Sequence, residues 1–255
     1  MHGPLLEVST DAGLSLRDVF ALAKELQLPG VEYMSGLRDL VADPATAAAL
    51  SQEYGVPVTS IHEPLWLVAY APSLLYRHLL AGTKLFPEAN TYVIHLSSVL
   101  NYLQQGPGKV VRLAELARRH NLTLAVESNT TMPILECYPK VTRDPEAFAA
   151  FCIKHGLKMT LDTSHITACG GDIVAFYETY HEHIAMIHLS DYRDGKEHLP
   201  LANGSLPLTA LLGELRRTHY NGTVCIELEF PRARDTAKKV SHLAESVEFV
   251  RSHLF

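Results

Sequence analysis

Residues 158–165 of this chain read KMTLDTSH, and this stretch decides how the rest of the sequence is interpreted. A short apolar run ends in an aspartate, a hydroxyl pair and a histidine. This order is typical of a buried strand whose carboxyl end delivers polar side chains into a pocket. We therefore expect Asp162 and His165 to carry chemistry at the end of a strand that extends over 158–165.

The same pattern recurs in five further segments. Each is an apolar run closed by one side chain that can bind a metal, and a helical pattern follows each. The segments SIHEP, VIHLSS, LAVESN, MIHLSD and CIELEF supply His62, His95, Glu127, His188 and Glu227, respectively. Six strand ends of this kind would form a metal site if they met in one pocket.

The order of the elements predicts an α/β protein that is a single (β/α)8 TIM barrel, with residues 1–255 as one domain. The strands are expected at 5–10, 31–34, 58–62, 91–98, 122–129, 158–165, 184–191 and 223–230. Helical patterns follow at 15–28, 43–55, 73–86, 108–120, 144–156, 172–181, 207–219 and 236–253. An open doubly wound sheet is less consistent with the sequence, because STDAGLS after the first strand lacks the glycine pattern G-x-G-x-x-G.

The composition is that of a soluble globular protein. Hydrophobic residues make up 47% of the chain, yet no apolar run approaches the roughly 20 residues that span a bilayer. The N-terminus lacks the features of a secretory signal, so we expect a cytoplasmic protein that makes no membrane contact. The four cysteines contain no C-x-x-C pair, so we expect neither a disulfide framework nor a thiolate zinc site.

The charge balance bears on the partner. A net charge of -6 and a pI near 6.1 argue against a protein that binds by neutralising many phosphates, so nucleic acid is a poor candidate. A small substrate that is anionic or rich in hydroxyl groups fits better. Whether the chain forms a homo-oligomer stays open.

The strongest chemical signal is a set of four residues on consecutive predicted strands, Glu127, Asp162, His188 and Glu227. Three carboxylates packed together repel one another, so their joint burial requires a divalent cation. Carboxylate oxygens with one imidazole suit Mn²⁺, Mg²⁺, Co²⁺, Fe²⁺ or Zn²⁺, and the ligand types alone do not select one. No organic cofactor is expected.

Each of these residues also has a simpler structural interpretation. A single aspartate at a strand end, such as Asp162, more often caps a helix than binds a metal. His62 and His95 could be buried histidines bonded to the backbone, or could complete a second site through Glu127, which favours zinc. Glu229 shares a strand face with Glu227, so the register of that ligand stays open.

The motifs VES, LDTSH, IHLSD and CIELE, with the loop GKEHLPLANGSLP, resemble the xylose-isomerase-like TIM-barrel superfamily. The likeness covers essentially the whole chain in element order. That superfamily includes sugar isomerases and epimerases, inosose dehydratases and isomerases, and the endonuclease IV type of abasic-site nuclease. The resemblance implies a catalytic metal bound by the four residues named above. In the ketose epimerase branch, the residues equivalent to Glu127 and Glu227 also exchange the substrate proton, and His165 and Arg193 would contact sugar oxygens.

The endonuclease branch resembles this chain through four further histidines, His62, His95, His165 and His198. That branch gathers three zinc ions, the third through an Asp-x-His pair. Here Lys196 occupies the position of that aspartate in the run KEH, so the charge at this position is inverted.

The leading hypothesis is therefore a metal-dependent isomerase or epimerase of a sugar, sugar derivative or cyclitol that works through an enediolate. Glu127 and Glu227 would transfer the proton, with His165 as a third catalytic residue. The substrate contacts would come from His62, His95, Arg193, His198 and Trp66. The alternatives are zinc-dependent cleavage of abasic DNA, dehydration of a keto-sugar or keto-cyclitol, and a catalytically silent barrel that binds no metal.

Overall fold

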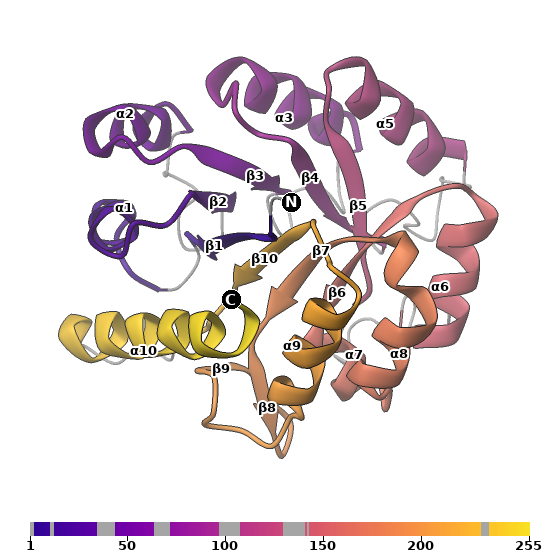
Figure 1. The fold of residues 1–255 in the computed structure, drawn as a ribbon. Helices are drawn as coiled ribbons and strands as arrows, with labels where there is room; N and C mark the ends of the chain where they lie inside the picture. Colours follow the sequence, from indigo (N-terminus) through magenta and orange to yellow (C-terminus); the bar gives the residue numbers. More distant parts are fainter. Residues whose placement is uncertain are drawn as a thin grey trace.

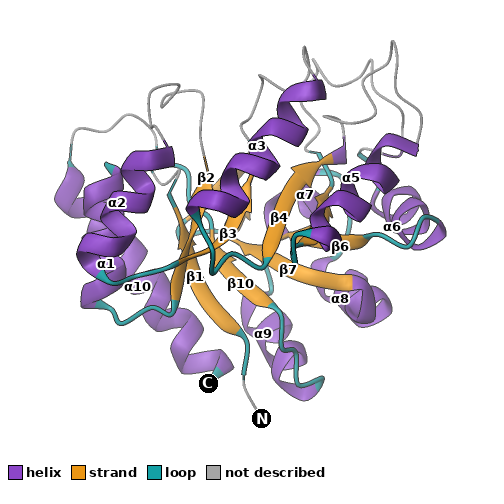
Figure 2. Cartoon of the chain, turned by 90° about the horizontal axis from the view of Figure 1, so that it is seen from above, coloured by secondary structure: helices purple, strands orange, loops and turns teal. Residues whose placement is uncertain are grey.

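The computed structural model describes residues 3–10, 13–34, 44–63, 72–96, 108–129, 141, 143–230 and 235–255. Parallel strands close into a barrel in the order β1-β10-β7-β6-β5-β4-β3-β2, and helices surround it (Figures 1 and 2). The strands are β1 (Leu5–Ser9), β2 (Gly30–Met34), β3 (Val58–His62), β4 (Thr91–His95), β5 (Thr123–Glu127), β6 (Lys158–Asp162), β7 (Ile184–Leu189) and β10 (Thr223–Ile226). The predicted (β/α)8 TIM barrel is confirmed.

The helices follow the strands in the predicted order. They are α1 (Leu16–Glu25), α2 (Pro44–Tyr54), α3 (Pro72–Leu85), α5 (Gly108–Arg119), α6 (Pro145–Lys154), α7 (Thr163–Ala168), α8 (Ile173–Tyr180), α9 (Leu208–Arg217) and α10 (Thr236–Leu254), with a 3-10 turn at His181–His183. Asp144 accepts a hydrogen bond from the Ala147 amide at 3.0 Å and Pro145 follows it, as the aspartate-proline order predicts. None of the described helices combines the length and the apolar character needed to cross a bilayer.

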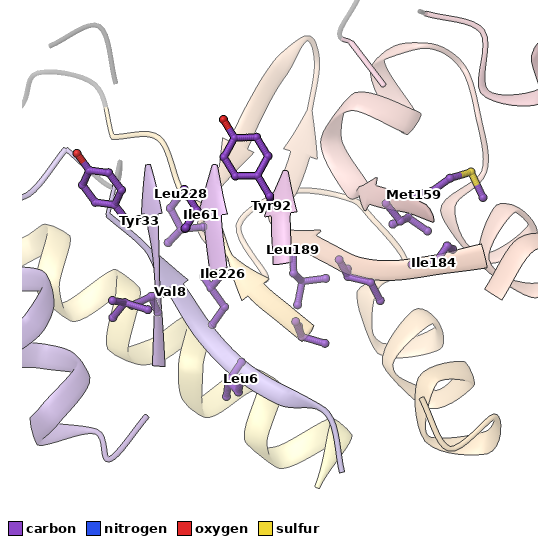
Figure 3. Close-up of a cluster of buried hydrophobic side chains, with 14 of the residues drawn as sticks. Leu6, Val8, Tyr33, Ile61, Tyr92, Met159, Ile184, Leu189, Ile226 and Leu228 are labelled. Atoms are coloured by element: carbon purple, nitrogen blue, oxygen red, sulfur yellow. The ribbon is translucent and has the colours of Figure 1, made fainter. Parts of the chain in front are cut away.

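The two faces of the strands have different characters. The outward residues are apolar and form the main core with the helices, and Figure 3 labels ten residues of this core. A second, small apolar cluster fills part of the barrel interior with Val93, Ala125, Met186 and Cys225. Because side chains alternate along a strand, the next inward positions lie at the carboxyl ends, where TIM barrels place their active sites.

Two sequence-based expectations about local structure are wrong. Strand β6 ends at Asp162, and Thr163–Ala168 form the short helix α7, so His165 lies on a helix rather than on the strand. The polar loop expected after β7, around GKEHLPLANGSLP, includes part of an antiparallel hairpin of β8 (Asp191–Arg193) and β9 (Lys196–Leu199). In both places polar residues form regular structure through hydrogen bonds that an apolar pattern does not report.

Two expectations are covered only in part by the described residues. Trp66, expected to contact the substrate, lies outside them. Among the described cysteines, Cys152, Cys169 and Cys225 are free thiols.

Candidate metal centre

The closing residues of the strand segments meet inside the barrel. His62, His95, Glu127 and Asp162 are the last residues of β3 to β6, His188 is the next-to-last residue of β7, and Glu227 directly follows β10. The register places His95 beside Glu127 and Asp162 beside His188. The expectation that all six side chains would converge on one region is therefore met by the geometry.

Four of these residues form one compact group, Glu127, Asp162, His188 and Glu227. Each offers one ligand atom, and the four atoms lie within 4.8 Å of one another. Nδ1 of His188 is 3.0 Å from Glu227 Oε2 and 3.3 Å from Glu127 Oε2. Glu229 is exposed, whereas Glu227 faces the group, so the geometry selects Glu227 from the two possible registers.

Three atoms of this group share an unusual property. Asp162 Oδ2, His188 Nδ1 and Glu227 Oε2 are buried, and no hydrogen-bond partner exists for them within the described part of the chain. Buried polar atoms without partners are rare, because desolvation then goes uncompensated. Three such atoms from three strands, close to one another, are the donor set that a divalent cation would satisfy. Buried His, Glu and Asp groups of this chain are thus consistent with a divalent metal site.

Asp162 combines its two predicted roles on separate oxygens. Its Oδ1 accepts hydrogen bonds from the His165 amide at 2.7 Å and from the Ser164 hydroxyl at 2.9 Å, and so caps helix α7. Its Oδ2 is the unpartnered atom of the group. The capping interpretation and the ligand interpretation of this residue are therefore compatible.

Three further histidines surround Glu127. His165 Nδ1 lies 2.9 Å from Glu127 Oε1, His62 Nε2 lies 3.3 Å from Glu127 Oε2, and His95 Nε2 lies 3.8 Å from Oε1. They form two more potential metal-binding groups, His62 with Glu127 and His188, and His95 with Glu127 and His165. Sequence reasoning gave His62 and His95 as substrate contacts or second-site ligands, and both roles suit this arrangement.

His198 reaches the same region from the β8–β9 hairpin. Its Nδ1 lies 4.0 Å from Asp162 Oδ2 and 3.9 Å from Glu227 Oε2. The backbone of His198 is left-handed, with φ of 52°, and its carbonyl accepts a hydrogen bond from the Glu229 amide. Arg193 behaves differently: it is exposed at the end of β8, beside Lys196 in the register, and no described contact joins its side chain to the four-residue group.

The charges at the centre perturb one another strongly. Burial lowers the pKa of the His62 imidazole, but the hydrogen bond to Glu127 and nearby carboxylates outweigh it and raise the pKa to about 9. Burial also lowers the pKa of the His165 imidazole, but the negative charges of Asp162 and Glu127 outweigh burial and raise this pKa to about 10. The pKa of His188 is raised well above its usual value, and the pKa of Glu127 and of Glu227 is lowered despite burial, chiefly by the His188 charge. The buried carboxylates thus stabilise positive charge beside them, which the protonated histidines provide in the absence of a metal ion.

Sequence reasoning missed buried carboxylates beside this centre, among them those of Glu7 and Glu32. Glu32 Oε1 lies 3.2 Å from His188 Nε2, and Glu7 lies close to Glu32 and Cys225. Both glutamates are fully buried in the middle of short strands, GVEYM and LLEVS. The sequence signal for each was a single carboxylate inside an apolar run. A prediction based only on strand ends does not include such a residue.

The model of the family described as xylose isomerase-like TIM barrels matches residues 109–253, more than half of the chain. This chain belongs to that family. The matched part contains Glu127, Asp162, His188, Glu227 and the β8–β9 hairpin.

The similar proteins align over nearly the full length of this chain, but their sequence identity to it is low. Uncharacterized proteins of Mycobacterium leprae and Mycobacterium tuberculosis are each 25% identical over 260 residues, which cover 92% of this chain and 91% of theirs. Among solved structures, 3-keto-D-glucoside 4-epimerase of E. coli is 16% identical with a TM-score of 0.73, over 98% of this chain and 99% of that one. D-psicose 3-epimerase of Clostridium cellulolyticum H10 is 13% identical with a TM-score of 0.75, over 98% and 99%. At these identities the structures show a common fold.

Proposed function

We propose that this protein is a divalent-metal-dependent isomerase or epimerase of a sugar, a sugar derivative or a cyclitol. The observation that carries the proposal is the convergence of three buried, unpartnered ligand atoms with Glu127 at the carboxyl ends of the strands. The substrate class is supported by the similar solved structures, which are epimerases of a keto-glucoside and of ketoses. The position of these atoms at the carboxyl ends of the barrel strands agrees with an active site for a small-molecule substrate.

The cation would be held by Glu127, Asp162, His188 and Glu227. A set of three carboxylates and one imidazole accepts Mn²⁺, Zn²⁺, Mg²⁺ or Co²⁺. When bound, the cation supplies Lewis-acid stabilisation of the negative charge that develops on a carbonyl oxygen as the neighbouring carbon loses its proton. No organic cofactor takes part in this proposal.

Glu227 is the better placed of the two glutamates to take the first proton. Its side chain is 14% exposed and its Oε2 has no hydrogen-bond partner in the described chain, whereas the Glu127 side chain is 1% exposed. Loss of the α-proton to Glu227 gives an enediolate. Return of a proton by Glu127 to the opposite face of the same carbon gives the epimer, and return to the adjacent carbon gives the isomer. His165, which contacts Glu127 Oε1 at 2.9 Å, is the group that resupplies Glu127 with a proton.

The remaining histidines would bind and orient substrate oxygens. His62, His95 and His198 place imidazole nitrogens around the four-residue centre, within reach of its carboxylates. Arg193 and Trp66 complete the set of proposed substrate contacts. Arg193 would require the hairpin tip to turn toward the substrate, because its side chain is exposed.

The test begins with chemistry rather than with a particular substrate. Protein loaded with Mn²⁺, Co²⁺, Zn²⁺ or Mg²⁺ is incubated in deuterated water with a panel of ketoses, keto-glycosides and cyclitols, and NMR records deuterium next to the carbonyl. We expect exchange on at least one compound, and we expect Glu227→Gln to abolish it. Glu229→Gln, an exposed change two residues away, is the matched control and should keep full exchange. Metal-loaded protein that exchanges no proton on any compound contradicts the proposal, whereas exchange with loss of a β-hydroxyl identifies a dehydratase.

A second candidate, zinc-dependent cleavage of abasic DNA, is favoured by one observation. His62, His95, His165 and His198 form further metal-binding groups that share residues with the four-residue centre. The net charge of -6 and the lysine at position 196 weigh against it. Three zinc ions per chain together with cleavage of an abasic duplex would establish this candidate and replace the first.

A further inference from the structure

A group of three buried polar residues lies next to the proposed metal centre. Strands β1 and β2 supply two of them and none of the proposed ligands, and β10, which Glu227 follows, supplies the third. Glu7 on β1, Glu32 on β2 and Cys225 on β10 are fully buried, and their carboxylate and thiol atoms lie within 4.8 Å of one another. The strand register places Glu7 beside Cys225, and Cys225 beside His188. The group therefore adjoins the one imidazole among the four proposed ligands.

The imidazole of His188 contacts different partners through its two nitrogens. Nε2 forms a hydrogen bond with Glu32 Oε1 at 3.2 Å, while Nδ1 lies 3.0 Å from Glu227 Oε2 and has no hydrogen bond within the described chain. A neutral imidazole carries one proton, on one nitrogen only, and the other nitrogen then has the lone pair that binds a metal. Carboxylates lie beside both nitrogens, Glu227 and Glu127 at Nδ1 and Glu32 at Nε2. When a cation held by Glu227 and Glu127 occupies the Nδ1 side, the Glu32 carboxylate, which can only accept, favours the proton on Nε2.

We propose that Glu32 is a positioning residue of the metal centre: its carboxylate keeps the proton of His188 on Nε2, so that Nδ1 presents its lone pair to the cation. This inference rests on the proposed metal site and deepens it. It assigns a role to a strand, β2, that supplies none of the proposed ligands. A metal-binding histidine whose second nitrogen donates to a carboxylate is held in one orientation and is a more basic ligand.

Glu7, Cys225 and His188 surround the carboxylate of Glu32 in the barrel interior. Two adjacent buried glutamates do not both ionise readily, since each charge opposes the other. Burial, together with the neighbouring Glu32, raises the pKa of Glu7 to about 8, so near neutral pH Glu7 retains its proton. The Cys225 thiol also donates to Glu32 Oε2 at 3.6 Å. The two oxygens of Glu32 thus contact two different groups, Oε1 the His188 imidazole and Oε2 the Cys225 thiol.

Two hydroxyl groups of strand β3 hold Glu7 in place. The hydroxyl groups of Thr59 and Ser60, both on β3, donate to the two carboxyl oxygens of Glu7. Thr59 reaches Glu7 past Gly30, where an added Cβ would lie 2.0 Å from Thr59 Oγ1. A side chain at position 30 would therefore displace this hydroxyl.

The first experiment measures metal affinity in three variants, with Zn²⁺ and Mn²⁺ as the only ligands and calorimetry as the readout. Glu32→Met keeps the side-chain length and removes the acceptor, and should weaken binding about 10-fold to 100-fold. Glu32→Gln keeps a neutral acceptor and should recover part of that loss. Glu7→Gln is the matched control: it changes a neighbouring buried glutamate that does not bond His188, and should bind within about threefold of the wild type. Thermal melts of the metal-free proteins check that each variant folds.

The second experiment observes the imidazole directly. Long-range ¹H–¹⁵N spectra of the zinc-loaded wild type should show His188 protonated at Nε2 and unprotonated at Nδ1. A proton on Nδ1, or a folded Glu32→Met variant with wild-type affinity, overturns the role of Glu32 alone. Wild-type protein that binds neither cation overturns the proposed function and this inference with it.

Discussion

Leu161 and Asp162 are neighbours on strand β6 and are both completely buried, but their side chains lie on opposite faces of the strand. Leu161 faces outward into the apolar core between strands and helices, while Asp162 faces inward and joins the four-residue group that could hold a metal ion. The same contrast holds between Ile187 and His188 on β7 and between Ile226 and Glu227 at the end of β10. Stability and chemistry thus occupy alternate positions of the same strands, so each should be separable from the other by single substitutions.

Among the effects of substitutions at neutral pH, the largest is expected on the outward face. Leu161→Ala removes buried methyl groups from a side chain with no exposed surface and leaves a cavity, so the free energy of unfolding should fall by about 3 kcal/mol. Metal affinity should stay within about threefold, because the side chain contacts the core and not the centre. Chemical denaturation measures the first quantity and calorimetry the second. A large loss of metal affinity in the folded variant would break the separation between the two faces.

Asp162, the next residue along β6, is expected to show the reverse: a large loss of metal affinity and little change in the free energy of unfolding. Asp162→Asn keeps an oxygen that can cap α7 but replaces the unpartnered Oδ2 by an amide, so Zn²⁺ or Mn²⁺ affinity should fall about 100-fold, equivalent to about 2.7 kcal/mol. The free energy of unfolding of the metal-free protein should change by less than about 1 kcal/mol, since the cap remains. Wild-type affinity in this variant would remove Asp162 from the proposed ligand set.

A pH experiment tests an exception to the contrast: Glu7, an inward-facing residue beside Glu32, is expected to affect stability. The pKa of Glu7 is raised from 4.5 to about 8 by burial and by Glu32. Between these values the folded chain holds a proton that the unfolded chain releases. The stabilisation linked to this group is therefore complete below pH 4.5 and is lost as the pH rises to 8, by about 1.4 kcal/mol per pH unit.

Glu7→Gln removes that titration and keeps the shape of the side chain. The unfolding free energy of the wild type minus that of the variant should therefore decrease steadily from pH 5 to pH 8, in metal-free protein followed by urea denaturation. Parallel stability curves for the two proteins would show that Glu7 does not retain its proton in the folded state.

The smallest expected effect is at the helix ends, far from the inward face. Asp144→Ala removes the side chain that accepts from the Ala147 amide, so the free energy of unfolding should fall by about 1 kcal/mol. Metal affinity should not change. Asp144→Asn keeps an acceptor at this position and should restore most of the stability, whereas an equal loss in both variants would mean that the cap is not the cause.

The outward face could be predicted from the sequence because it is regular. Apolar runs such as KMTL and IAMI, followed by helices capped by residues such as Asp144, are sufficient to predict the barrel and its element order. The strand-end rule also brought together Glu127, Asp162, His188 and Glu227, since the topology of a barrel gathers carboxyl ends at one face.

The inward network could not be predicted in the same way. The contact between Glu32 and His188 joins residues 156 positions apart, on strands β2 and β7 that β1 and β10 separate in the closed barrel. The position of His165 was wrong because Asp162 caps a helix there, and capping depends on one hydrogen bond rather than on hydrophobic periodicity. The β8–β9 hairpin was missed for a related reason: the carboxylate of Asp191 accepts from the amides of Tyr192, Gly204 and Leu206, which no alternation of apolar residues encodes.

The most direct test of the metal centre is a crystal structure of the protein soaked with Mn²⁺ or Zn²⁺, with data collected at the absorption edge of that metal. We expect an anomalous peak at roughly 2.0–2.3 Å from His188 Nδ1 and from a carboxylate oxygen each of Glu127, Asp162 and Glu227. No peak at this position under saturating metal, or a peak bound by other residues alone, would contradict the account.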